Sequence, residues 1–137
     1  MSEFKKQVTA AIIRKEGKIL IAQRGRDDEE LPLLWEFPGG KLEPGETPEE
    51  CIIREIKEEL DLDIQPLGIY REIEYQLGDQ TIPITFFCAE IKGGQMQLRV
   101  HEDARWIHMS EIKEYEFMPP DVEVVKLLEK QGEFSAQ

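Results

Sequence analysis

Residues 40–62 read GKLEPGETPEECIIREIKEELDL and contain the clearest helix signal of the chain. Thr47 suits the N-cap position, Pro48 suits the first helical position, and Glu50 completes a T-x-x-E capping box with Thr47. The apolar residues that follow are spaced i, i+3 and i+7, as on one helix face, and they are Ile53, Ile56 and Leu60. The segment therefore predicts a helix that begins directly after Thr47 and packs one face on a core.

The same helix carries three carboxylates on another face. Glu55, Glu58 and Glu59 are spaced i, i+3 and i+4, so their side chains emerge close together. Like charges at this spacing repel one another by a few tenths of a kcal/mol per pair. Mg²⁺ takes oxygen ligands, usually one or two carboxylates together with substrate phosphates. Two interpretations follow: a metal-binding surface, or an acidic stripe facing solvent.

The chain before the helix alternates short apolar runs with turns. Residues 8–13 and 19–22 predict a β-hairpin, and residues 25–30 predict a charged loop in solvent. Residues 35–37 predict a short apolar strand that ends at a turn over 38–40. Two adjacent glycines in that turn let the backbone come close to another group.

A second, longer hairpin is predicted after the helix, from residues 67–77 and 81–91. Pro83 in its second arm indicates an edge or a bulge, because proline cannot donate to a strand ladder. After a Gly-Gly turn, short strands are predicted over 97–99 and 104–107.

The C-terminal part predicts two helical segments. Ser110 is expected to cap a brief helical turn, and Asp121 to cap a final helix that ends near Lys130. This order of strands and helices predicts an α/β fold with a mixed sheet between helices. The length predicts a single domain over residues 1–137.

The composition excludes some partners. There are 17 Lys and Arg against 29 Asp and Glu, a net charge of −12, so the chain lacks the cationic surplus needed to bind a nucleic acid duplex. No apolar run approaches the ~20 residues of a membrane span. A polar N-terminus without a signal-peptide core predicts a cytoplasmic protein. Cys51 and Cys88 lack metal-site spacing and are expected to be reduced packing residues. The oligomeric state is not indicated.

Residues 40–62 resemble the Nudix box, whose pattern is Gly, five residues, Glu, seven residues, then Arg-Glu-hydrophobic-x-Glu-Glu-x-Gly-hydrophobic. The positions in register are Gly40, Glu46, Arg54, Glu55, Ile56, Glu58, Glu59 and Leu62. Asp61 stands where the pattern has Gly, at a left-handed helix end that Asp tolerates. The stretches WEFPGGKLEPGETPEE, IIRKEGKILIAQR and FMPPDVEVVKLLEK extend the likeness to the MutT-type branch, which includes a CTP pyrophosphohydrolase, over nearly the whole chain.

The resemblance implies a Nudix fold, an α/β/α sandwich with a mixed β-sheet, and a metal-dependent active site. Glu58 and Glu59 match the principal metal ligands, and Glu55 matches a catalytic residue assigned as metal ligand, general base or both. The Gly39 carbonyl matches a further metal contact, and Glu102 is the nearest candidate for a late acidic ligand. The implied cofactor is Mg²⁺, for which Mn²⁺ can substitute.

Further positions are implied to brace the site or to bind the substrate. Arg54 and Glu46 match positions that pair with the catalytic carboxylates or fix the loop. Arg24 and Lys41 match basic positions near a triphosphate. Asp121 falls within one residue of the position that contacts the base in MutT-type enzymes, so it is predicted to be a helix cap or a base contact.

The implied activity is the hydrolysis of a nucleoside triphosphate to a nucleoside monophosphate and pyrophosphate, with an ordinary nucleotide or an oxidised or modified one as the substrate. The alternatives within the family are ADP-ribose, dinucleoside polyphosphates and nucleotide sugars as substrates. A non-catalytic nucleotide sensor is disfavoured because the three helix glutamates are intact. Trp35 and Phe37 are expected in the core rather than stacked on a base. His101 and His108 are expected to be surface or hydrogen-bonded histidines.

Overall fold

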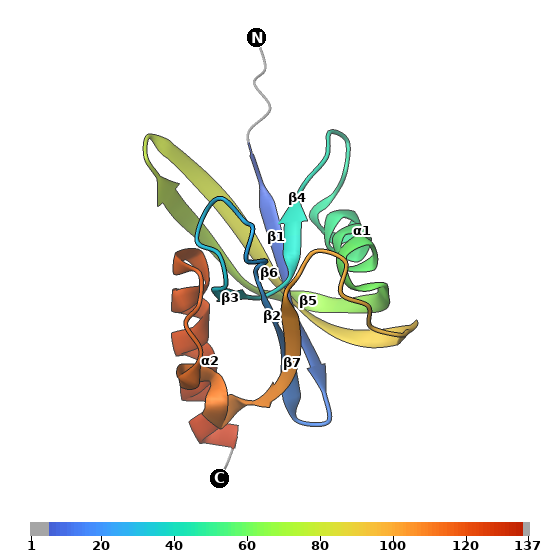
Figure 1. Ribbon diagram of the computed structural model, residues 1–137, viewed down its shortest axis with the longest axis vertical. Coiled ribbons are helices and arrows are strands. Elements are labelled where there is room, and N and C mark those ends of the chain that lie inside the picture. The colour runs from blue at the N-terminus through green and yellow to red at the C-terminus, as the bar shows by residue number, and fades with distance from the viewer. Residues whose placement is uncertain (1–5, 136–137) are drawn as a thin grey trace.

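The computed structural model describes residues 6–135 and has one mixed sheet between helices (Figure 1). In chain order the elements are β1 (Val8–Lys15), β2 (Lys18–Gln23), β3 (Trp35–Glu36), β4 (Gly39–Lys41), α1 (Pro48–Leu60), β5 (Leu62–Leu77), β6 (Gln80–Gly94), β7 (Asp103–His108), the 3₁₀ turns η1 (Met109–Glu114) and η2 (Pro119–Asp121), and α2 (Val122–Ser135). The predicted α/β class is confirmed. None of the helices in this part of the chain is both long and apolar enough to cross a membrane.

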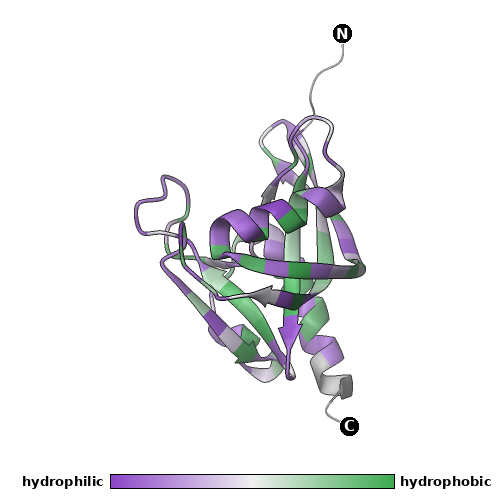
Figure 2. Ribbon diagram, turned by 90° about the vertical axis from the view of Figure 1, so that its right-hand side faces the viewer, coloured by the Kyte–Doolittle hydropathy of each residue, from purple (hydrophilic) through white to green (hydrophobic). Residues whose placement is uncertain are grey.

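Strand β1 lies at the centre of the sheet. It pairs in parallel with β6 and antiparallel with β2 and β4, while β3 and β7 pair with β2, and β5 pairs with β6. Alternate residues of β1 enter two cores: Ala10 and Ile12 pack with residues of α2, and Ala11 and Ile13 pack with residues of α1. Burial on both faces explains why β1 reads as a continuous apolar run. Figure 2 shows apolar residues concentrated on the strands of the sheet.

The N-terminal cap of α1 is as predicted. The Thr47 side chain accepts a hydrogen bond from the Glu50 backbone N–H, the Glu50 carboxylate accepts one from the Thr47 N–H, and Asp61 ends the helix with φ of 58°. The predicted apolar face is partly wrong, because Ile53 is 42% exposed. Ile56 and Leu60 are buried as predicted, and Cys51 and Ile52 are buried with them in place of Ile53.

Both predicted hairpins form, with longer strands. Residues 93 and 94 belong to β6 rather than to a turn, and residues 97–99 do not form a strand. That segment runs along the C-terminal end of α1, where Gln97 and Arg99 donate backbone hydrogen bonds to the Leu60 and Glu59 carbonyls over 2.9 and 3.2 Å. The last carbonyls of a helix have no N–H partner within the helix, so they are free to accept these backbone hydrogen bonds from the segment. Pro83 lies one residue beyond the first β1–β6 pair, Val8 with Ile84, which fits the expected edge position.

Three further expectations are corrected. The predicted turn over 38–40 is in part strand β4, paired with β1. η1 begins at Met109 rather than being capped by Ser110, and the Glu111 carboxylate accepts the His108 backbone N–H over 2.8 Å. Helix α2 continues to Ser135 instead of ending near Lys130.

Two aromatic residues and the two cysteines that were expected to be packing residues are at least partly buried. Trp35 and Phe37 are buried, and the Trp35 ring meets the Tyr115 ring edge-on at 5.0 Å between centroids. Cys51 is a buried free thiol and Cys88 is a half-buried one.

Candidate active site

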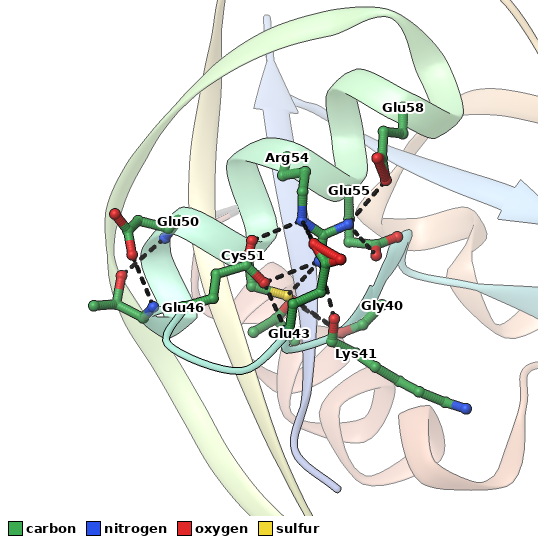
Figure 3. Close-up of polar contacts among 11 residues, drawn as sticks. Gly40, Lys41, Glu43, Glu46, Glu50, Cys51, Arg54, Glu55 and Glu58 are labelled. Carbon is green, nitrogen blue, oxygen red and sulfur yellow. Dashed lines mark hydrogen bonds and ion pairs between the residues drawn. The ribbon is translucent and has the colours of Figure 1, made fainter.

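Arg54 of α1 organises the loop that precedes the helix (Figure 3). Its Nε and Nη2 donate to the two carboxylate oxygens of Glu46 over 2.6 and 2.9 Å, and Nη2 also donates to the Lys41 carbonyl over 3.1 Å. The Glu43 backbone N–H donates to Glu46 as well. The hydrogen bonds from Arg54, which have the largest effect, and the one from Glu43 lower the pKa of Glu46 to about 2. The loop from 41 to 46 is therefore fastened to the helix.

The other side of the Arg54 guanidinium holds two of the predicted catalytic carboxylates. Its Nη1 donates to Glu55 and to Glu58, over 2.8 Å in each case. Glu55 is largely buried, with a side chain 16% exposed, whereas that of Glu58 is 59% exposed. Arg54 thus offsets the repulsion between two of the three clustered glutamates.

Within the described part of the chain, one carboxylate oxygen of Glu59 is buried and lacks a hydrogen-bond partner. Burial, followed by the charges of Glu55 and Glu36, raises the pKa of Glu59 to about 9. A buried carboxylate beside other acidic groups is stabilised either by binding a proton or by a nearby cation.

The glycine pair permits two close approaches. A Cβ on Gly39 would collide with the Thr9 carbonyl and the Ala10 Cα, and a Cβ on Gly40 would collide with the Glu55 carboxylate. Gly39 thus lets β4 lie against β1, and Gly40 leaves room for the Glu55 carboxylate.

A cavity of about 420 Å³ is lined by residues from the sheet, α1 and the connecting loops. The predicted site residues that line it are Arg24, Gly39, Lys41, Glu59 and Asp121. The predicted site residues outside its lining are Glu46, Arg54, Glu55, Glu58 and Glu102. The structure therefore brings the two predicted cations, one helix glutamate and Asp121 into one cavity.

Two lining residues, Glu36 and His101, were missed by sequence reasoning. The Glu36 carboxylate accepts from Arg24 Nη1 over 3.2 Å and lies 2.9 Å from His101 Nε2. The His101 side chain is only 4% exposed. Successive side chains of a strand point to opposite faces, and Trp35 and Phe37 are buried on one face. This alternation would have placed the Glu36 carboxylate on the other face. The contact with Glu36 confirms the expectation that His101 is hydrogen-bonded, but no sequence pattern placed it in a site, and His108 is exposed, as expected.

Asp121 does not act as the predicted helix cap. Its carboxylate is buried and accepts a hydrogen bond from the Phe37 backbone N–H over 2.9 Å. Burial raises the pKa of Asp121 to about 8, although the bond from Phe37 opposes the shift. The side chain belongs to the cavity wall, and its role as a base contact remains a prediction.

Glu102 lies on the surface beside Arg26. Its two oxygens accept from Arg26 Nε and Nη2 over 3.2 and 3.1 Å, and the Arg26 backbone N–H lies 3.3 Å from the first of them. These bonds lower the pKa of Glu102. The predicted late metal ligand is thus engaged with an arginine.

The acidic helix face suits a hard divalent cation such as Mg²⁺, which takes oxygen ligands. Among the described residues no group of three or more acidic, histidine or cysteine side chains lies close enough together to hold a metal ion by itself. The partnerless oxygen of Glu59 is nevertheless the kind of buried atom that a cation satisfies. Glu55 and Glu58 neighbour it on the same helix face, and the Gly39 carbonyl belongs to the adjoining β4.

Comparisons with known proteins agree on one family. The NUDIX domain profile matches residues 3–132. The chain is 29% identical to the 8-oxo-dGTP diphosphatase of Escherichia coli (strain K12), covering 92% of this chain and 98% of that protein. It is 30% identical to the CTP pyrophosphohydrolase of the same strain, covering 88% of each. The crystal structure of MutT protein from Methanosarcina mazei Go1 superposes with a TM-score of 0.78 at 22% identity, covering 99% of both chains, which shows the shared fold.

Proposed function

The chain belongs to the NUDIX family and is a pyrophosphohydrolase acting on phosphoric anhydride bonds, and from that premise we propose that its substrate is a nucleoside triphosphate. The products are a nucleoside monophosphate and pyrophosphate. The names of two relatives, an 8-oxo-dGTP diphosphatase and a CTP pyrophosphohydrolase, support this substrate class.

The observation that carries the proposal is the lining of the cavity. Arg24 and Lys41 supply positive charge for phosphate groups in a chain whose net charge is −12. Glu59 supplies a carboxylate from the acidic helix face, and Asp121 supplies a buried polar group that can meet a base. One cavity thus holds groups suited to both ends of a nucleotide.

Glu55, Glu58, Glu59 and the Gly39 carbonyl are the groups that we expect to hold Mg²⁺ or Mn²⁺. Such an ion, when bound, neutralises charge on the phosphate oxygens and lowers the pKa of an attacking water. Arg54 keeps Glu55 and Glu58 oriented, and its bond to Glu46 holds the preceding loop in place. Glu55 is the residue that we expect to accept a proton from water if one helix glutamate acts as general base.

A substrate screen tests the proposal. The protein is incubated with each nucleoside triphosphate, 8-oxo-dGTP, ADP-ribose, a dinucleoside polyphosphate and a nucleotide sugar, with and without Mg²⁺. Pyrophosphate and inorganic phosphate are measured separately. We expect metal-dependent release of pyrophosphate from at least one triphosphate. Faster turnover of ADP-ribose or of the other compounds would refute the substrate class, and tight nucleotide binding without turnover would indicate a sensor.

A helix variant pair separates catalysis from general charge effects. Glu58→Gln removes a proposed ligand, and Glu49→Gln removes an exposed glutamate from the first turn of the same helix. We expect the first variant to lose most turnover and the second to retain it. Equal turnover in the two variants would contradict the proposed metal site.

A further inference from the structure

The segment of residues 95–102, which joins β6 to β7, runs along the last turn of α1 (Figure 1). The end of β6 lies directly against the end of the helix, because a Cβ on Gly94 would lie 2.6 Å from the Asp61 carbonyl oxygen. Farther along, the backbone N–H groups of Gln97 and Arg99 donate to the last carbonyls of the helix. The segment therefore rests on the end of the helix that carries the acidic face.

Asp61 contacts this segment with its side chain as well. Its Oδ2 lies 3.4 Å from Arg99 Nη2, and its Oδ1 lies 3.3 Å from Lys57 Nζ. Each carboxylate oxygen thus has its own cation, and the Asp61 side chain is 26% exposed. Asp61 stands where the family pattern has glycine, which has no side chain to make these contacts.

The helix end itself does not require a carboxylate at this position. The Asp61 backbone N–H donates to the Lys57 carbonyl, and its φ of 58° is the left-handed conformation that ends many helices. Glycine adopts that conformation without steric cost, and asparagine tolerates it as aspartate does. Helix termination alone therefore gives no reason for the charge of Asp61.

The residues that follow Arg99 belong to the site. Val100 and His101 line the cavity, and Glu102, the predicted late metal ligand, comes next. The Glu102 backbone N–H donates to the carbonyl of Gln23, the last residue of β2, over 2.9 Å. These three residues thus lie between an anchor on α1 and an anchor on β2.

We propose that Asp61 is a positioning residue, whose carboxylate holds Arg99 and thereby fixes residues 100–102 beside the cavity. Residues 95–100 are exposed, and exposed segments with few contacts open at little cost in free energy. The loss of one contact therefore changes how often the segment is closed. The consequence for turnover rests on the proposed function, whereas the anchoring can be measured without substrate or metal.

A set of variants at the helix end tests the anchor. Asp61→Asn, Arg99→Gln and the double variant remove the ion pair from either side and from both sides. Asp63→Asn is the matched control, because Asp63 Oδ1 lies 3.3 Å from the same Lys57 ammonium and its neutralisation leaves the pair of Asp61 and Arg99 in place.

Amide hydrogen exchange is measured by NMR on the metal-free variants at fixed pH. The protection of the Gln97 and Glu102 N–H groups, relative to the intrinsic exchange rate of each sequence, reports the two ends of the segment. We expect each single variant to lower the protection of both amides by roughly two- to fivefold, the loss typical of one partly exposed ion pair. The double variant should lose no more than the larger single loss, because both changes remove the same contact.

The control Asp63→Asn should exchange like the wild type at both amides. Additive losses in the double variant would show that Asp61 and Arg99 act separately, and a loss confined to Gln97 would show that the anchor does not reach residues 100–102. Either result, or full protection in both single variants, would overturn the proposal.

Asp61→Gly separates positioning from helix termination. Glycine suits the left-handed helix end, so we expect the Tm to stay within about 3 °C of the wild-type value. The protection of Gln97 and Glu102 should nevertheless fall as it does in Asp61→Asn. Intact protection in Asp61→Gly would show that Asp61 only ends the helix, and would refute its positioning role.

Turnover of CTP adds a measurement that a purely structural contact would not change. In Asp61→Asn and Arg99→Gln we expect the Mg²⁺ concentration for half-maximal rate to rise, by no more than the factor lost in protection, because only the closed segment holds Glu102 in place. The kcat at saturating Mg²⁺ should change by less than about twofold. An unchanged Mg²⁺ requirement would overturn the positioning role. If the wild-type protein turns over no triphosphate while both amides lose protection as expected, the anchor stands and the proposed substrate is refuted.

Discussion

The two glycines of β4 should respond differently to the same added methyl group. In Gly39→Ala the new Cβ meets the backbone of Thr9 and Ala10, which cannot move without shifting the central strand β1. In Gly40→Ala the nearest atoms to the new Cβ are those of the Glu55 carboxylate, which can rotate away. Neither glycine has a positive φ, so alanine adds no backbone strain at either position. The first change should therefore affect stability and the second should affect catalysis.

The expected sizes differ clearly. Overpacking against backbone costs about 1 to 3 kcal/mol, which lowers the Tm of a domain of this size by roughly 5 to 15 °C in Gly39→Ala. In Gly40→Ala, Glu55 loses its bond to Arg54, while Arg54 keeps Glu46, so we expect the Tm to fall by less than about 5 °C. Displacing a general base or metal-binding carboxylate should lower kcat by about a hundredfold or more.

Thermal unfolding and nucleotide turnover are measured together for both variants. Gly93→Ala is the control, because the nearest atom to its added Cβ is an Asp63 oxygen at 3.8 Å, an ordinary contact. Turnover in Gly40→Ala above a tenth of the wild-type value would refute the argument that Gly40 makes room for a catalytic Glu55. A larger Tm loss in Gly40→Ala than in Gly39→Ala would refute the distinction between backbone and side-chain collisions.

Three further outcomes are expected. Glu59→Gln should abolish most turnover while raising the Tm at pH 7, because the folded protein holds Glu59 protonated there, with a pKa of about 9, whereas the unfolded chain ionises it, and glutamine removes this protonation cost; a lowered Tm would contradict this account. Asp121 has a raised folded pKa of about 8, so its contribution to stability is lost as the pH rises through that value. Asp121→Asn should accordingly gain stability relative to the wild type as the pH rises from about 4 to about 8, with no further gain above that, and it should change the kcat/KM ranking of the bases by roughly tenfold if the side chain contacts the base. With ¹⁸O water and a triphosphate substrate, attack at the β-phosphorus should place label in pyrophosphate, whereas label in the monophosphate would indicate attack at the α-phosphorus.

Local features of the site could be predicted from the sequence because they depend on neighbours within one or two helical turns. The capping box of Thr47 and Glu50 and the shared face of Glu55, Glu58 and Glu59 follow from fixed i, i+3 and i+4 geometry. The direction of the helix could not be predicted as fully. Ile53 fits an apolar spacing but faces solvent, because the sheet selects which stripe of the helix is covered.

The sequence by itself determined the family, the helix that carries the acidic residues, and the order of strands and helices. Only the tertiary structure decided which polar residues meet in the cavity. His101 and Glu36 are 65 positions apart, and Asp121 and Phe37 are 84 positions apart, so no local spacing relates them. Asp121 followed two prolines as a cap would, yet burial against Phe37 gave its carboxylate another donor. Contacts of this kind depend on how strands pair and loops fold over the sheet, and that information is distributed along the whole chain.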